Sequence, residues 1–289
     1  MSDSPSQPEP LEPLAAELDA LETAESTGLG DADAGLQQDG KPVILFKHVS
    51  IAFGDHVVLR DVSFSVKRGQ TLCILGRSGV GKSVSLRLLM GFLKPDAGSI
   101  CVDGQEVVGL DEEGLRAIRQ RVTMVFQNGA LFDSLSVREN VAFPLRERGG
   151  LSDEQIDDLV NRLIGLVGAE DVVEDLPASL STGRKRAVAM ARALAAQPEI
   201  VLYDEPTTMV DPLIARRLGS LIQRLKKQLG FTSIVVTHDM RFAESLADTV
   251  LFLDNGQASY FGPLQGFLAS RNAHIREFLA LDEYVLPLA

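Results

Sequence analysis

The residues with the clearest chemical purpose form one glycine-rich segment with the pattern G-x-x-x-x-G-K-S. Its members are Gly76, Arg77, Ser78, Gly79, Val80, Gly81, Lys82 and Ser83. Glycines at this spacing let backbone N–H groups turn toward the β- and γ-phosphates of a nucleotide. Lys82 neutralises phosphate charge, and the Ser83 hydroxyl can ligate Mg²⁺. The pattern therefore predicts a phosphate-binding loop.

Two more motifs follow this segment in order. The first is Leu180-Ser181-Thr182-Gly183-Arg184, and the second is the apolar run 200–203 followed by Asp204, Glu205 and Pro206. A Glu directly after an apolar strand beside a phosphate loop is typical of a group that polarises water, although it could be a solvated loop carboxylate. One phosphate-loop match is only a hypothesis. Three ordered motifs predict ATP hydrolysis of the kind that drives movement elsewhere.

The apolar runs on either side of the loop predict how it is supported. Residues 71–75 are typical of a buried strand and residues 84–90 of a helix, so the glycines lie at a strand-to-helix turn. The N-terminal end of that helix adds a partial positive charge beside the phosphates. A glycine-rich turn that merely reverses the chain is the alternative, and the surrounding elements disfavour it.

Periodicity in the rest of the chain predicts an α/β fold. Strand patterns at 43–53, 57–66, 99–102 and 122–126 make the front half rich in β-structure, with turns at Gly54-Asp55 and Asp103-Gly104. Helices at 151–168, 182–194, 213–229 and 240–247 accompany strands at 200–203, 233–236 and 250–253. The alternation predicts a mostly parallel sheet with helices on both sides.

The net charge of −12 is concentrated at one end of the chain. Residues 1–40 hold ten acidic side chains and no Lys or Arg, which leaves 30 of the 40 acidic residues against 28 basic ones in the remainder. The composition predicts a disordered acidic tail over residues 1–40, which would repel nucleic acid. The remainder has no CxxC pair and no basic stripe, so no nucleic-acid partner is expected.

Composition also limits how the chain meets a membrane. At 289 residues and 45% hydrophobic content, it can bury one large core or two modest ones. No apolar stretch approaches the ~20 residues of a membrane-spanning helix, so any membrane contact is expected to go through a partner. Cys73 and Cys101 lie in apolar runs without metal-ligand spacing and are predicted to be small core residues.

Together these motifs resemble the nucleotide-binding subunit of an ATP-binding-cassette (ABC) transporter over residues 43 to about 265. The resemblance implies an α/β, ABC-type P-loop domain with a mostly parallel core sheet, an antiparallel β subdomain and a helical signature subdomain. It implies an ATPase domain at 41–265, with the helical subdomain at about 128–190, followed by a C-terminal extension at 266–289.

The resemblance also implies individual roles, with ATP and Mg²⁺ as cofactors. Phe53 stacks on adenine, Gln127 joins Ser83 and Asp204 in holding Mg²⁺, Glu205 is the general base, Asp211 lies in a loop that crosses a dimer interface, and His238 is near the γ-phosphate. Lys82, Glu205 and His238 are thus the expected catalytic residues. From its own pattern, Phe53 could equally pack a core, and His238 follows a strand's C-terminal end, where ligands bind in open α/β sheets.

The signature motif departs from the family pattern Ser-Gly-Gly-Gln, which binds the γ-phosphate held by the opposite subunit of a homodimer. This chain keeps Ser181 and Gly183 but has Thr182 and Arg184 at the other two positions. Thr182 adds a Cβ at a close backbone approach, and Arg184 is expected to add positive charge near phosphate. Active but slower hydrolysis is predicted. Met209-Val210 replaces the usual Gly-Leu before Asp211.

Residues 126–147 resemble the corresponding segment of Mla-type lipid-transport ATPases. The segment is predicted to be loop-like, with Phe132, Asp133 and Arg146 as candidates for a permease-facing surface. The resemblance implies phospholipid transport between envelope membranes, with a polytopic permease and an MCE-domain protein as partners, and peripheral attachment to the cytoplasmic face of the inner membrane. The alternatives are an importer ATPase for another solute and a non-transport cassette.

Overall fold

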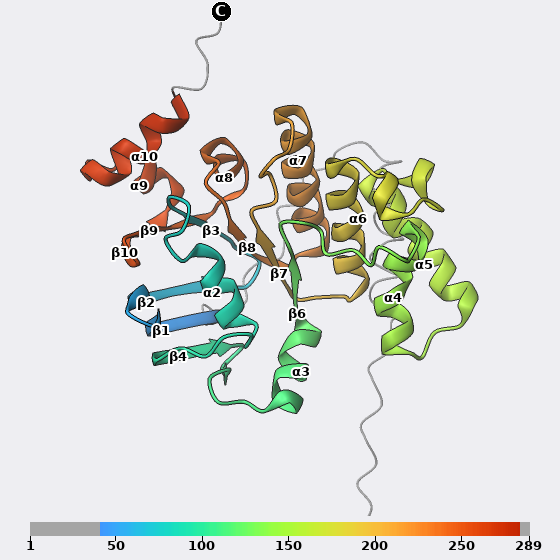
Figure 1. Ribbon diagram of the computed structural model, residues 1–289, viewed down its shortest axis with the longest axis horizontal. Coiled ribbons are helices and arrows are strands. Elements are labelled where there is room, and N and C mark those ends of the chain that lie inside the picture. Colours follow the sequence, from blue (N-terminus) through green and yellow to red (C-terminus); the bar gives the residue numbers. More distant parts are fainter. Residues whose placement is uncertain (1–40, 284–289) are drawn as a thin grey trace, which may run out of the picture.

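The computed structural model describes residues 41–283; the predicted acidic tail at 1–40 and residues 284–289 of the predicted C-terminal extension lie outside this range. Within it, the strands form two sheets (Figure 1). The smaller sheet is antiparallel, in the order β2-β1-β4-β5, and contains β1 (Pro42–Phe53), β2 (His56–Lys67), β4 (Ala97–Val102) and β5 (Gln105–Glu106). The turn predicted at Gly54-Asp55 is confirmed, with Gly54 at a φ of +60°.

The larger sheet is six-stranded, in the order β10-β9-β3-β8-β7-β6. Its parallel strands are β3 (Thr71–Leu75), β6 (Val122–Val125), β7 (Ile200–Asp204), β8 (Thr232–Val236) and β9 (Thr249–Asp254). The edge strand β10 (Gln257–Pro263) runs antiparallel to β9. The predicted mostly parallel sheet is therefore confirmed. The strand predicted at 122–126 is confirmed as β6, and it pairs with β7 of the second half of the chain, Val122 with Ile200, a pairing that the sequence pattern did not indicate.

Helix α3 (Glu112–Arg121) accounts for that pairing. Asp111 caps its N-terminus by accepting a hydrogen bond from the Gly114 N–H at 2.9 Å, and Leu115 and Ile118 are buried. The helix carries the chain from β5 at the edge of the small sheet to β6 at the edge of the large one (Figure 1). Such a crossover lets a strand join a parallel sheet, and no pattern in the sequence predicted this helix.

Alternate residues of the parallel strands enter two separate hydrophobic cores. Cys73, Leu75, Val201, Tyr203 and Val235 belong to the core beneath the helical half of the chain. Leu72, Ile74, Ile200, Leu202, Ile234 and Val236 belong to the core shared with the small sheet and α2 (Lys82–Leu89). Successive side chains of a strand point to opposite faces, so β3, β7 and β8 are buried on both sides. Cys73 is buried as predicted, whereas Cys101 is only half-buried.

Helices α4 (Val137–Arg148), α5 (Asp153–Val167) and α6 (Thr182–Ala195) pack on one another to one side of β6 and β7 (Figure 1). The helices predicted at 151–168 and 182–194 are confirmed. The prediction that 126–147 is loop-like is wrong after residue 136. Ser136 and Glu139 form a capping box that starts α4, and Pro144 lies inside the helix. A proline at a helix interior removes a backbone donor, which is why the pattern does not indicate a helix there.

The remaining helices return the chain to the large sheet. Helices α7 (Pro212–Leu229) and α8 (Met240–Leu246) confirm those predicted at 213–229 and 240–247. Helices α9 (Leu264–Leu268) and α10 (Ala273–Glu283) follow β10, and the ring of Phe278 lies 5.1 Å from that of Phe252 in β9 between centroids. Across residues 41–283, no helix has the length and apolar character needed to span a bilayer.

Candidate nucleotide site

The glycine-rich loop between β3 and α2 follows a path that larger residues would block. Gly76 has a φ of +148°, and a Cβ there would lie 2.4 Å from the carbonyl oxygen of Leu253. Gly81 has a φ of +98°, and a Cβ there would lie 2.7 Å from Cδ2 of Leu59. Gly79, with a φ of +84°, faces open space. Arg77, Ser78 and Gly79 are exposed and Val80 is half-buried, so this part of the loop faces solvent, where its N–H groups are accessible to a phosphate.

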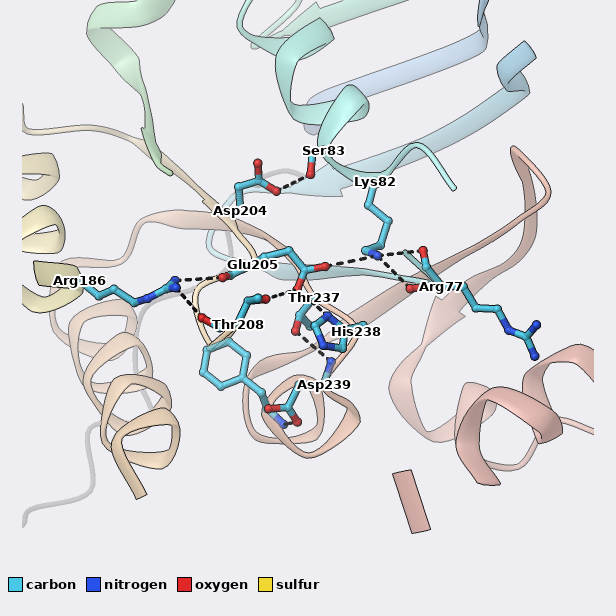
Figure 2. A network of polar contacts seen from close by, with 12 residues as sticks. Arg77, Lys82, Ser83, Arg186, Asp204, Glu205, Thr208, Thr237, His238 and Asp239 are labelled. Atoms are coloured by element: carbon cyan, nitrogen blue, oxygen red, sulfur yellow. Dashed lines mark hydrogen bonds and ion pairs between the residues drawn. The ribbon is translucent and has the colours of Figure 1, made fainter. Parts of the chain in front are cut away.

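The side-chain amine of Lys82 is buried and bound to the main chain of the same loop. The residue is 5% exposed, and its Nζ donates to the carbonyl oxygens of Gly76 at 2.9 Å and Arg77 at 3.0 Å. The same Nζ forms an ion pair with Glu205 Oε1 at 3.3 Å (Figure 2). All three donor positions of an ammonium group therefore have partners, and the charge is already placed where a phosphate would bind.

Ser83 and Asp204 present two oxygens to one point at the end of β7. The Ser83 hydroxyl donates to Asp204 Oδ1 at 2.6 Å (Figure 2). Burial raises the pKa of Asp204, and the Ser83 bond opposes that rise. A hydroxyl and a carboxylate are the hard oxygen ligands that Mg²⁺ prefers, so the donor set fits this ion. Gln127 lies exposed after β6, and the described residues show no bond from it to either group.

Glu205 is surrounded by groups that hold its carboxylate in one place. His238 Nδ1 lies 2.8 Å from Oε2, and the Thr208 hydroxyl donates to the same oxygen at 3.1 Å. Burial favours a raised pKa, but the His238 hydrogen bond and the Lys82 charge outweigh it and lower the pKa of Glu205. The bond to Glu205 in turn raises the pKa of His238. The carboxylate is therefore kept ionised, the form that a general base requires.

Other predicted site residues are not joined to this cluster within the described chain. Phe53 lies at the end of β1 and is 50% exposed, so the core-packing alternative is wrong. Ser181 is the N-cap of α6, and its hydroxyl accepts from the Arg184 N–H at 3.4 Å. Gly183 packs against α7, where a Cβ would lie 2.6 Å from Ile214 Cγ2. Asp211 caps α7 through the Leu213 N–H at 2.8 Å.

The structure places the residues that differ from the family pattern, which are Thr182 and Arg184 in the signature motif and Met209 in the loop before Asp211. Thr182 is exposed at the first helical position of α6 and has a negative φ, so its backbone conformation does not require a glycine. The Arg184 guanidinium turns to Asp171, with bonds of 2.6 and 2.9 Å, and to the Gly168 carbonyl at 2.6 Å. The expected charge near phosphate is thus paired within its own chain. Met209 has a φ of +59° and is 91% exposed, which explains why glycine is usual there.

Two residues that contact Glu205 were not identified from the sequence. Thr208 binds its carboxylate, and Arg186 on α6 donates to the main-chain carbonyls of Glu205 at 3.0 Å and Thr208 at 2.6 Å (Figure 2). Glu205 itself has a φ of +48°. No pattern in the sequence indicates these contacts, because Arg186 lies on a different helix and its acceptors are backbone atoms.

A glycine-rich loop between a central parallel strand and a helix, with a buried lysine and two carboxylates at the end of β7, defines a P-loop nucleotide-binding protein. A family model described as ABC transporter matches residues 59–208. The chain belongs to the ABC transporter family, whose members hydrolyse ATP.

Curated relatives fall in more than one transport class. The methionine import ATP-binding protein MetN of Brucella abortus (strain 2308) is 39% identical over 82% of this chain and 64% of its own, so this chain spans less than two thirds of that relative. The intermembrane phospholipid transport system ATP-binding protein MlaF of Haemophilus influenzae is 36% identical over 82% of this chain and 90% of its own. Protein TRIGALACTOSYLDIACYLGLYCEROL 3 of Arabidopsis thaliana is 36% identical, and the match covers 94% of this chain and 82% of that protein.

A solved structure shares the same fold. It is a dimeric, post-hydrolysis state of the ATP-binding cassette MJ0796 bound to ADP and Pi. It matches with a TM-score of 0.70 and 30% identity, and the match covers 76% of this chain and 98% of that one. The two sheets and the helical part described above are therefore those of an ABC ATPase.

Proposed function

We propose that this chain is the ATP-hydrolysing subunit of an ABC transporter that moves phospholipid between envelope membranes. The observation that carries the hydrolytic role is the Lys82–Glu205 ion pair at 3.3 Å beside the Ser83–Asp204 hydrogen bond at 2.6 Å. These contacts bring a phosphate-binding amine, a base and a pair of Mg²⁺-type oxygens to one edge of the sheet. The similarity to MlaF and to the Arabidopsis protein supports the lipid assignment.

Each side chain has a role that follows from its position. Lys82 exchanges its carbonyl partners for the phosphates of ATP, and the N–H groups of residues 76–83 surround them. Glu205 accepts the proton of the attacking water, while His238 holds the carboxylate in place. Mg²⁺, held by Ser83, Asp204 and Gln127, would supply neutralisation of phosphate charge. Phe53 offers an exposed ring to the adenine.

The remaining site residues fit a site completed by a second copy. Ser181 and Gly183 stand at the N-terminal end of α6, which carries a partial positive charge, and Asp211 stands at the same end of α7. In an isologous dimer, each chain supplies its α6 end to the nucleotide that the other chain holds. The dimeric state of the MJ0796 structure supports this arrangement.

The exposed aromatic residues that flank Gln127 in the sequence are the proposed contact with the membrane permease. Phe126 and Phe132, on either side of Gln127 and its loop, are each 38% exposed. The Arg192 guanidinium lies 4.3 Å above the Phe132 ring, and Phe143 packs on the same ring at 4.7 Å. Held rigidly in this way, Phe132 is suited to anchor a partner helix. An MCE-domain protein and peripheral attachment at the cytoplasmic face of the inner membrane belong to the same proposal.

An importer ATPase for another solute is the second candidate. It is favoured by the relative with higher identity, the methionine import protein MetN. Purification from membranes separates the two, because the lipid proposal expects a polytopic permease with an MCE-domain protein. A solute-binding protein in place of the MCE protein would favour the importer.

The transport role is tested in proteoliposomes that hold the whole complex. Phe132→Asp is expected to reduce lipid transfer by about tenfold or more while basal ATP hydrolysis persists, since it removes an interface anchor and no nucleotide contact. Phe92→Asp is the matched control, because Phe92 is also exposed and also lies under a guanidinium, that of Arg119 at 4.9 Å. Equal transfer by both variants would rule out the docking role of Phe132.

The dimer is tested separately by light scattering. The Glu205→Gln protein is expected to form a dimer with ATP and Mg²⁺, because nucleotide binding is kept while hydrolysis is lost. Turnover per subunit of the natural chain should rise with protein concentration. A persistent monomer at saturating nucleotide, alone and with the permease, would contradict the shared site.

A further inference from the structure

Arg186 is a buried charge whose position the proposed function does not explain. It lies in the second turn of α6 and is 5% exposed. Within residues 41–283 its guanidinium binds two main-chain carbonyls and forms no ion pair with a carboxylate. Its Nε is buried and has no hydrogen-bond partner in the same range. Burial accordingly lowers the pKa of Arg186, and the attraction of Glu205 opposes this.

A buried arginine of this kind is not expected to add to the stability of the folded state. Burying a charged group costs free energy that two neutral acceptors offset only in part, and an apolar side chain of similar volume would pack at least as well. What the guanidinium does provide is a planar fork with two donors of fixed separation. The fork spans the carbonyls at the two ends of one short turn, at 3.0 Å from Glu205 and 2.6 Å from Thr208 (Figure 2).

That turn carries the catalytic carboxylate in a costly backbone conformation. Glu205 has a φ of +48°, a region that costs a non-glycine residue about 1 kcal/mol or more. Its N–H donates to the Val236 carbonyl at 2.9 Å, and Thr208 closes the turn with N–H and hydroxyl bonds back to Glu205. Arg186 adds the bonds that tie this turn to a different helix. Gly183, packed on Ile214, makes a second contact between the same helix and α7, which follows this turn in the chain.

Helix α6 therefore connects two places that are chemically distinct. Its N-terminal end carries Ser181, and its second turn holds the Glu205 turn. Building on the proposed dimer, we propose that Arg186 is a positioning residue that makes the placement of Glu205 at one ATP depend on the position of α6, whose end addresses the other ATP. The two hydrolytic sites of the dimer are coupled in this way through one guanidinium in each chain.

The test compares Arg186→Met, which roughly keeps the volume and removes the bonds to both carbonyls, with Arg186→Lys, which keeps the charge but replaces the planar fork with a single ammonium group. Arg186→Met is expected to lower kcat by about 100-fold, the scale of a 1 Å misplacement, while the Kd for a fluorescent ATP analogue is unchanged. Its Hill coefficient for turnover against ATP is expected to fall toward one. Arg186→Lys is expected to lie between Arg186→Met and the natural chain, and it keeps the test open if the methionine variant does not fold.

The control is Arg119→Met, since Arg119 also donates to a carbonyl of another element, that of Met90 at 3.1 Å, away from Glu205. It should keep the natural kcat and Hill coefficient. A folded Arg186→Met protein with natural kcat and Hill coefficient overturns the coupling, and so does a fall in kcat matched by loss of ATP affinity. Natural turnover by Glu205→Gln would instead overturn the proposed general base, so the two failures are distinguishable.

Discussion

The two ends of strand β7 carry similar ion clusters with different consequences. At its C-terminal end, Glu205 is bound by Lys82 and His238. Just before its N-terminal end, Glu199 is bound by Arg68 at 2.7 Å and by Arg121 at 2.7 Å, and Asp103 joins the same arginines. Both carboxylates have a lowered pKa, that of Glu199 to about 2 because of the Arg121 hydrogen bonds. Ion pairing by itself therefore does not mark a catalytic group.

The nature of the partners separates the two ends. Arginine is always protonated and binds a carboxylate through a fixed fork, so the Glu199 cluster ties β7 to α3 and to the turn after β4. Lysine and histidine bind a carboxylate through a single nitrogen, which can also take up other hydrogen-bond partners. Nζ of Lys82 does so, since it also donates to two main-chain carbonyls of the loop. The C-terminal edge of a parallel sheet is also where ligands bind. Substitutions at the two ends should therefore separate chemistry from stability.

The largest expected effect is on hydrolysis. Glu205→Gln is expected to lower kcat by about 10²–10⁴-fold, because the water loses its base, while ATP binding persists. Steady-state turnover and equilibrium binding of a fluorescent ATP analogue measure the two quantities. Glu199→Gln is the matched control and should keep the natural kcat. Natural turnover by Glu205→Gln would erase the distinction between the two clusters.

The next effect is on nucleotide affinity. Lys82→Ala is expected to weaken ATP binding by about 10–100-fold, since charge-assisted hydrogen bonds to the phosphates are lost. Lys226→Ala serves as its control, because Lys226 also forms an ion pair, with Asp248, at the opposite end of the sheet. Titration with an ATP analogue gives both Kd values. An unchanged Kd for Lys82→Ala would show that the loop does not hold the phosphates.

A smaller effect concerns pH. The hydrogen bond from His238 helps keep the pKa of Glu205 low, so His238→Ala is expected to move the acid limb of the kcat profile to higher pH. The profile is measured by steady-state turnover on both sides of neutrality. His274→Ala is the control, since Nδ1 of His274 pairs with Asp254 Oδ2, at a distance of 2.9 Å, and not with Glu205. Identical acid limbs for His238→Ala and the natural chain would separate His238 from the base.

The smallest effect is on stability. Glu199→Gln is expected to lower the free energy of unfolding by about 1 kcal/mol at pH 7, a modest value because the cluster is partly exposed and screened. The folded pKa of Glu199, about 2, lies below its ordinary value of 4.5, so this difference is full above pH 4.5 and disappears as the pH falls through about 2. Urea unfolding at several pH values measures it. Glu112→Gln, at a more exposed pair with Arg119, should show less change.

The sequence by itself determined the fold class, most of the strands and helices and the residue types of the phosphate loop. These follow from local chemistry: glycines at fixed spacing, a lysine and a serine at the start of a helix, and an apolar strand that ends in two carboxylates. Capping and periodicity also placed α5, α6, α7 and α8. Local patterns failed where one residue contradicted its neighbours, as Pro144 does inside α4.

Only the tertiary structure decided which groups share a partner. It paired Arg184 with Asp171, 13 residues away, so that its charge is not directed at phosphate. It paired β6, residues 122–125, with β7 in the parallel sheet, since this pairing is set by a crossover helix and not by the strand's own residues. It also brought Arg186 to the carbonyls of Glu205 and Thr208. Backbone acceptors carry no sequence signal, so contacts of this kind become visible only when distant elements pack together.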